Sequence, residues 1–158
     1  MVTIHPFKNE YSSSFKSLNL EWIEEFFSVE EEDSKILSNP KEYVIDKGGE
    51  IFFAKQDDKI VGTSAIIPSG PRNFELAKMA VTKSIQGQGV GRMLIDVSIQ
   101  FAKDKGADEV FLITNDTLIP ALKLYKSSGF DIDQNYDDNR YVRGNTKLKL
   151  KVNERRMG

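Results

Sequence analysis

The 158-residue sequence lacks cysteine, has a single histidine and contains no long hydrophobic run. Without cysteine there are no disulfide bonds, no thiolate metal sites and no cysteine nucleophile. His5 has no second histidine with which to form a zinc pair, so we expect it to be structural and expect no bound metal. No stretch approaches the roughly 18 apolar residues that span a bilayer, and the N-terminal segment has no apolar core of signal-peptide length. We therefore expect a cytoplasmic protein.

The charges are nearly balanced, with 22 Lys and Arg residues against 24 Asp and Glu residues and a net charge of -2. This balance leaves no broad basic field, which argues against nucleic acid or an anionic membrane as a partner. A length of 158 residues with 39% hydrophobic side chains is enough for one compact core. We predict a single domain over residues 1–153, followed by a short tail at residues 154–158.

Hydrophobic periodicity divides the chain into alternating helical and extended segments of a mixed α/β domain. Helical spacing predicts helices at residues 12–27, 30–37 and 90–105 and around 121–127, with a further short segment at 41–47. Apolar runs predict strands at residues 2–6, 74–81, 109–114, 130–136 and 145–152, and a hairpin within 51–67.

A glycine-rich turn joins the strand that ends at Val81 to the helix that begins at Val90. Glycines at positions 87, 89 and 91 let backbone N–H groups converge at the positive end of the helix dipole, an arrangement that favours phosphate or pyrophosphate. Gly91 is followed by Arg92 and Met93, so the turn is not a Walker loop, and its spacing also fails the dinucleotide fingerprint. A simple tight connection is the alternative explanation.

Three motifs occur in order across residues 75–130. The strand ending Met-Ala-Val leads to Gln-x-x-Gly-x-Gly, a second strand ends in Asn115, and Ala-x-x-Leu-Tyr-x-x-x-Gly-Phe follows at residues 121–130. Together they resemble the signature of the GCN5-related N-acetyltransferase (GNAT) superfamily. The resemblance implies a central, mostly antiparallel twisted sheet that is splayed between its fourth and fifth strands and flanked by helices. It also implies acetyl-coenzyme A as the acyl donor, with no metal.

The resemblance assigns the coenzyme to the turn and to the backbone of the strand before it. We expect the pyrophosphate on the turn, with the N–H groups of Gly87, Gly89, Gly91 and Arg92 as its donors and with Gln86, Gln88 and Val90 completing it. Gln86 either braces the turn or reaches the ligand. The pantetheine arm is expected along Met79, Ala80 and Val81 as an added strand, with the Met79 N–H pointing at the thioester oxygen. Asn115 either contacts the ligand or caps the next helix.

Two residues are candidates for proton transfer. Tyr125 matches the family position that protonates the departing thiolate, and a phenol keeps its proton at neutral pH. A core tyrosine is the alternative. Glu75 is the candidate base, since it lies four residues before Met79 on one strand, and strict alternation places both side chains on the same face. A water molecule is the alternative base, with Glu75 as an exposed charge.

The acceptor site is expected in the helical N-terminal region. Trp22, Phe26 and Phe27 lie there beside an acidic run made of Glu24, Glu25, Glu30, Glu31, Glu32 and Asp33. Acidic residues could attract an amine, although charge runs are usually solvated and aromatic residues usually belong to the core. Tyr136, Arg140 and Tyr141 are candidates for the other wall.

These observations predict an N-acetyltransferase that moves an acetyl group to a primary amine of a small molecule or peptide, by direct attack within a ternary complex. The alternatives are a coenzyme A-binding sensor without transfer activity and a nucleotide-binding α/β module. Dimers are common in the superfamily, so a homodimer is possible.

Overall fold

The computed structural model describes residues 1–133 and 144–153, which form one mixed α/β unit around a seven-stranded sheet. The strands are β1 (Val2–His5), β2 (Glu50–Gln56), β3 (Lys59–Pro68), β4 (Asn73–Val81), β5 (Glu109–Thr114), β6 (Asp131–Ile132) and β7 (Thr146–Lys151). The helices are α1 (Ser12–Phe26), α2 (Glu31–Ser38), α3 (Val90–Asp104) and α4 (Ile119–Ser127). Short turns of 3-10 helix, η1 (Asn9–Tyr11) and η3 (Lys83–Ile85), and of π-helix, η2 (Lys41–Ile45), join them. No helix in this part of the chain is long and apolar enough to cross a membrane.

The predicted elements are confirmed with shifts of one or two residues at their ends, except at the strand expected over 130–136. There β6 covers only Asp131–Ile132, and positions 134–136 lie outside the described residues. The predicted tail at 154–158 lies outside them as well. The strand order is β1-β2-β3-β4-β5-β7-β6, and β4 and β5 form the parallel pair in an otherwise antiparallel sheet. The predicted fold class is therefore confirmed.

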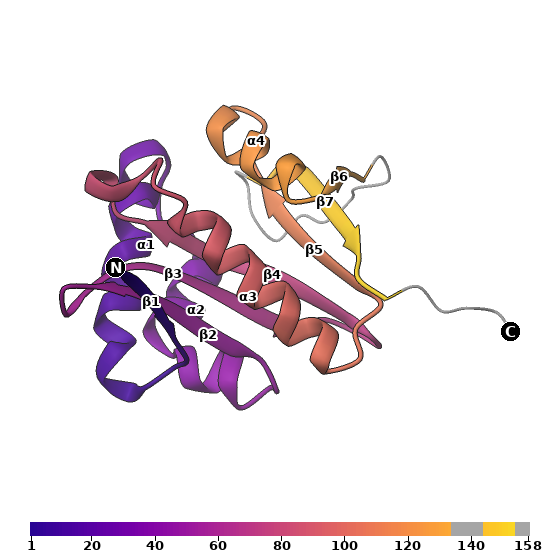
Figure 1. The fold of residues 1–158 in the computed structure, drawn as a ribbon, viewed down its shortest axis with the longest axis horizontal. Helices are drawn as coiled ribbons and strands as arrows, with labels where there is room; N and C mark the ends of the chain where they lie inside the picture. The colour runs from indigo at the N-terminus through magenta and orange to yellow at the C-terminus, as the bar shows by residue number, and fades with distance from the viewer. Residues whose placement is uncertain (134–143, 154–158) are drawn as a thin grey trace, which may run out of the picture.

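Helices cover both faces of the sheet (Figure 1). On one face α3 lies over what we call the α3 core, whose buried residues include Phe52, Ile66, Leu76, Leu94, Val110, Phe130 and Leu148. On the other face α1 and α2 lie over the α1 core, which includes Phe15, Ile23, Leu37, Val44, Ile51, Phe53 and Ala65. The two cores use alternate residues of the central strands, as the two-residue period of a strand requires.

The sheet opens between its fourth and fifth strands. β4 pairs with β5 only from Asn73↔Glu109 to Glu75↔Phe111, whereas β4 stays paired with β3 up to Val81 and β5 stays paired with β7 up to Thr114. Figure 1 shows β5 diverging from β4 toward α4. The splay that the resemblance implied is therefore present, and it begins immediately after Glu75.

A β-bulge interrupts β4 just beyond this opening. Thr63 of β3 lies opposite Ala80 and Ala65 lies opposite Ala77, so Lys78 and Met79 together face Ser64 alone. Lys78 has a φ of 50°, in the left-handed region that a non-glycine residue adopts at a cost of about 1 kcal/mol. The extra residue reverses which side chains of β4 point to which face.

Candidate active site

A cavity of about 980 Å³ occupies the opening between β4 and β5. Among its lining residues are almost all of those predicted to bind the coenzyme or to transfer protons: Glu75, Met79, Ala80, Val81, Gln86, Gly87, Gly89, Val90, Gly91, Arg92, Asn115 and Tyr125. The exception is Gln88, whose side chain is exposed to solvent and does not line the cavity. Residues that are 50 positions apart in the sequence thus meet in one site.

The cavity passes from one face of the sheet to the other. Val90, Leu124 and Tyr125 line it and pack with the α3 core. Trp22 also lines it and packs against the α1 core on the opposite face. A ligand that filled the cavity would therefore enter beside α3 and present its other end beside α1.

The glycine-rich turn has the geometry of an anion cradle. Gly87 and Gly89 have φ angles of 84° and 82°, and a side chain on either would point into open space. The first hydrogen bond of α3 runs from the Met93 N–H to the Gly89 carbonyl, so the N–H groups of the first three helical residues have no partner within the helix. Free N–H groups at a helix N-terminus favour a phosphate group.

Gln86 braces this turn. Its side-chain amide donates a hydrogen bond to the Val81 carbonyl at 3.0 Å, joining the two ends of the connection. The bracing role that the sequence allowed is therefore present, and because Gln86 also lines the cavity, its contact with the ligand stays a prediction. The cradle is built from backbone, with the glutamine side chain fixing its shape.

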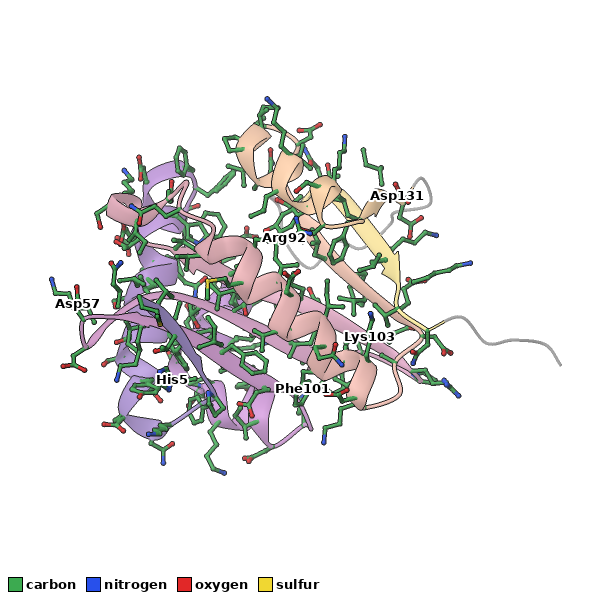
Figure 2. The ribbon with its side chains drawn as sticks, in the orientation of Figure 1. His5, Asp57, Arg92, Phe101, Lys103 and Asp131 are labelled. Atoms are coloured by element: carbon green, nitrogen blue, oxygen red, sulfur yellow. The ribbon has the colours of Figure 1, made fainter. Side chains whose placement is uncertain are left out.

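Arg92 connects α3 to α4. Figure 2 shows its side chain between the two helices, and its guanidinium lies 3.2 Å from Asp96 and donates to the Ser127 carbonyl at 3.4 Å. Gly91 brings the two helices close, since a Cβ there would lie 3.0 Å from the Leu124 side chain. The third glycine of the turn therefore serves helix packing as well as the cradle.

Glu75 lies at the apex of the cavity, in the last residue pair that joins β4 to β5. Its side chain is 8% exposed, and it pairs across the ladder with Ile67, which packs against the α1 core. Met79 packs against the α3 core instead. The prediction that these two side chains share a face is therefore wrong, because the bulge at Lys78 shifts the alternation by one residue.

Tyr125 reaches the cavity from α4, on the α3 side of the sheet. Its ring packs edge-on against Phe130, with centroids 6.3 Å apart, and Gly129 with a φ of 103° turns the chain so that this contact forms. The spacing Tyr-x-x-x-Gly-Phe thus encodes a helix end that fixes the tyrosine. Burial raises the pKa of Tyr125 to about 12, so the hydroxyl is protonated at neutral pH.

Asn115 follows β5 and holds the turn that leads to α4. Its side-chain oxygen accepts hydrogen bonds from the Thr117 backbone N–H at 2.9 Å and from the Thr117 hydroxyl at 2.6 Å. Its backbone carbonyl accepts the Leu118 N–H at 3.0 Å. These bonds hold the turn before α4 and do not cap the helix, whose N-cap is Leu118 without a side-chain cap, so the capping role that the sequence allowed is not present. Asn115 lines the cavity, and its contact with the ligand stays a prediction.

The predicted acceptor elements separate into two groups. Trp22, Phe26 and Phe27, at the end of α1, line the cavity. The acidic run does not line it, and three of its members form ion pairs: Glu25 with Lys83, Glu32 with Lys35, and Asp33 with the lining residue Lys78. Tyr136, Arg140 and Tyr141, proposed for the other wall, lie outside the described residues.

Lys78 is a lining residue that sequence reasoning missed. Its ammonium donates to the Asp33 carboxylate at 2.6 Å, and both side chains are buried, at 5% and 0% exposure. The signal was present in the strand, where apolar residues change from even positions (Phe74, Leu76) to odd positions (Met79, Val81). That change of phase marks the bulge.

No metal site accompanies the cavity in the described part of the chain, where no cluster of three or more His, Asp or Glu side chains could hold an ion. His5 lies on β1 (Figure 2), with its ring 2.8 Å from the Thr3 hydroxyl. It is not among the residues that line the cavity. Its contact is a local one on the first strand.

Comparison with known proteins agrees with this geometry. The acetyltransferase (GNAT) family model matches residues 15–130. N-acetyltransferase 8B of Rattus norvegicus is 34% identical over 95 residues, which span 57% of this chain and only 43% of the rat protein. A GNAT-family acetyltransferase from Staphylococcus aureus Mu50 shares the fold with a TM-score of 0.89 at 22% identity, covering 97% of this chain and 100% of that one. A Bacillus subtilis acetyltransferase solved with CoA has a TM-score of 0.71 at 23% identity, covering 96% and 99%. The chain therefore belongs to the acetyltransferase (GNAT) family.

Proposed function

We propose that this protein is an N-acetyltransferase that moves an acetyl group from acetyl-coenzyme A to a primary amine, by direct attack within a ternary complex. The observation that carries the proposal is the cavity that opens where the β4–β5 ladder ends. It has a backbone anion cradle on one face of the sheet and a protonated tyrosine in its wall. Family membership and the CoA complex of the B. subtilis relative support the same donor.

The residues present fit acetyl-coenzyme A. The free N–H groups at the start of α3 suit its pyrophosphate, and the edge of β4 from Met79 to Val81, which has left β5, suits the amides of its pantetheine arm. The volume of about 980 Å³ is at the upper end of the roughly 300–1,000 Å³ typical of small-molecule sites. The Met79 N–H is the donor that we assign to the thioester oxygen.

Transfer requires one new bond, one broken bond and two proton movements. The amine nitrogen bonds to the thioester carbon and the carbon–sulfur bond breaks, while the nitrogen loses its proton and the sulfur gains one. Tyr125 is the group that we assign to protonate the departing sulfur, because its raised pKa keeps the proton available. Glu75, directly or through a water molecule, is the group that we assign to accept the proton from the amine.

The positions of these two groups suit their separate tasks. Tyr125 approaches the cavity from the α3 side, where the coenzyme cradle lies, and Glu75 points to the α1 side. The acceptor amine would then meet its base on the face where the aromatic residues of α1 lie, and the leaving sulfur would meet its acid on the coenzyme side. The bulge that overturned the predicted shared face is what separates them.

Release of free thiol from acetyl-coenzyme A in the presence of a panel of amines tests the proposal. The chain has no cysteine, so a thiol reagent reports coenzyme A alone. We expect amine-dependent release that falls at least about tenfold in Tyr125→Phe, while the affinity for coenzyme A is retained. Tyr43→Phe is the matched control, because Tyr43 lies outside the cavity and packs beneath Lys47.

Two results would contradict the proposal in different ways. Coenzyme A binding without release from any amine would favour the sensor that the sequence left as an alternative. Unchanged thiol release in Tyr125→Phe would be consistent with acetyl transfer but would show that Tyr125 is not the general acid.

A further inference from the structure

The buried pair between Lys78 and Asp33 ties α2 to the wall of the cavity. The Lys78 ammonium donates to one carboxylate oxygen of Asp33 at 2.6 Å, and the two side chains are 5% and 0% exposed. The other carboxylate oxygen accepts the Glu30 N–H at 2.9 Å in the capping box of α2. Asp33 is therefore held by its own helix, and Lys78 is held by Asp33.

This pair requires the bulge of β4. Leu76 packs in the α3 core, and strict alternation would turn the side chain of Lys78 toward the same core, away from α2. Because the bulge adds one residue to β4, Lys78 instead reaches Asp33 on the opposite face of the sheet. A buried lysine without its counterion is strongly disfavoured, so the pair favours the bulged register over the regular one.

The strand opposite the bulge is held from the other face. Ser64 of β3 faces both bulged residues, and its hydroxyl is hydrogen-bonded to that of Ser98 on α3 at 2.8 Å. Both serines are fully buried. The bulge thus lies between a tie to α3 on one face and a tie to α2 on the other, and Lys78 keeps its left-handed φ of 50° within this frame.

We propose that Asp33, acting through Lys78, is a positioning residue for acetyl transfer. It holds β4 in the bulged register and so fixes the Met79 N–H, the donor assigned to the thioester oxygen. The inference rests on the proposed function and adds to it a residue of α2 that is not among those lining the cavity.

The expected consequence is a loss of rate with little loss of coenzyme affinity. A shift of β4 to the regular register would turn Met79 toward the other face. A group displaced by about 1 Å from its productive position costs on the order of a hundredfold in rate. The anion cradle lies in the turn at 86–92, beyond the bulge, so coenzyme A binding depends much less on the pair.

Lys78→Met combined with Asp33→Asn, which we call the neutral-pair variant, tests the proposal. It removes both charges together, and the Asn side-chain oxygen can still accept the Glu30 N–H, so no buried charge loses its counterion. We expect kcat for thiol release to fall about tenfold or more, with the Kd of coenzyme A within about threefold of the wild type. Circular dichroism verifies that the variant is folded at the assay temperature.

Leu37→Ala is the matched control. Leu37 is 2% exposed on the same helix and packs in the α1 core, so its truncation loosens α2 without removing the pair. We expect its kcat to stay within about threefold of the wild type.

The infrared stretch of the thioester carbonyl supplies a readout that needs no acceptor. A hydrogen bond to the carbonyl oxygen polarises the bond and lowers its stretching frequency. With carbon-13-labelled acetyl-coenzyme A bound, we expect a lower frequency in the wild type and in Leu37→Ala than in the neutral-pair variant.

The outcomes separate the inference from the proposed function. Equal carbonyl frequencies in the wild type and the neutral-pair variant overturn the positioning role, and wild-type thiol release then leaves acetyl transfer intact. Equal losses of kcat in the neutral-pair variant and in Leu37→Ala also overturn it, because any loosening of α2 would then suffice. A lower frequency in the wild type than in the neutral-pair variant, with no thiol release from any amine, supports the positioning role and contradicts the enzyme.

Discussion

Tyr125 is held in the form that a general acid needs. Burial raises its pKa to about 12, so the hydroxyl still carries its proton at pH values just above the ordinary tyrosine pKa of about 10. We predict that kcat rises with pH as the acceptor amine loses its proton, and that no falling limb due to Tyr125 occurs below about pH 11. The measurement is the pH profile of kcat up to pH 10.5, with circular dichroism to verify folding. A falling limb near pH 9 that disappears in Tyr125→Phe would show that the tyrosine titrates much lower.

Comparing Gly89 with Gly106 distinguishes the stability lost through left-handed backbone strain from the affinity lost at a ligand site. Its φ of 82° nearly equals the 83° of Gly106, which follows α3, and a Cβ at either would meet nothing within 4 Å. Both alanine variants should therefore lose about 1 kcal/mol of stability through backbone strain. Only Gly89→Ala should also weaken coenzyme A binding, by tenfold or more, because Gly89 lines the cavity and Gly106 does not. Urea unfolding and calorimetric titration measure the two effects, and equal affinities in the two variants would exclude Gly89 from the cradle.

At the level of elements, one buried ion pair fastens α2 to the bulge of β4. Lys78 donates to Asp33 at 2.6 Å, and the other carboxylate oxygen of Asp33 accepts the Glu30 N–H at 2.9 Å in the capping box of α2. Removing one partner leaves the other charge buried without its counterion. We predict that Lys78→Met lowers the free energy of unfolding by about 3–5 kcal/mol, as measured by urea denaturation.

An exposed pair and a double variant control this prediction. Lys41→Met breaks the Lys41–Asp46 pair, whose side chains are 61% and 52% exposed, and should cost less than about 1 kcal/mol. Adding Asp33→Leu to Lys78→Met removes the uncompensated charge and should recover most of the loss, short of the roughly 1 kcal/mol of the capping box. Equal losses in Lys78→Met and Lys41→Met would mean that the buried pair contributes no more than a surface pair.

The elements themselves could be read from the sequence, because each follows a regular hydrophobic period or a local capping motif. The hairpin turn at Asp57 and Asp58, both with positive φ, and the helix end at Gly129 are local in this sense. The bulge was not predicted, because strict alternation was assumed along β4 although the apolar positions change phase between Leu76 and Met79. The Lys78–Asp33 pair joins residues 45 positions apart, so neither local spacing nor composition indicates it.

At the level of the whole molecule, the sheet consists of two halves that meet at a short seam. β1 to β4 form one half and β5 to β7 the other, and three residue pairs from Asn73↔Glu109 to Glu75↔Phe111 join them directly. The resemblance predicted this opening, and almost all of the residues that it assigned to the site line the cavity, because they lie on the elements that flank the opening. The proposed acceptor side lies outside the family motifs, at the end of α1, where the sequence offered Trp22, Phe26 and Phe27 as candidates beside an acidic run that does not line the cavity. Homodimer formation stays a prediction.

A ligand that filled the opening beyond this seam should connect the two halves of the sheet. Coenzyme A with its arm along β4 would shield backbone N–H groups on both sides of the opening, at residues 76–81 and 112–115 as well as in the turn at 86–92. We predict slower amide hydrogen exchange in all three segments when coenzyme A is added at about 100 times its Kd, where binding contributes about 2.7 kcal/mol of stability. Peptides from the β2–β3 hairpin at 50–68 correct for this global gain. Extra protection confined to 86–92 would mean that the cradle holds the pyrophosphate while the pantetheine arm lies outside the opening between β4 and β5. The assignment of the Met79 N–H to the thioester oxygen would then be wrong.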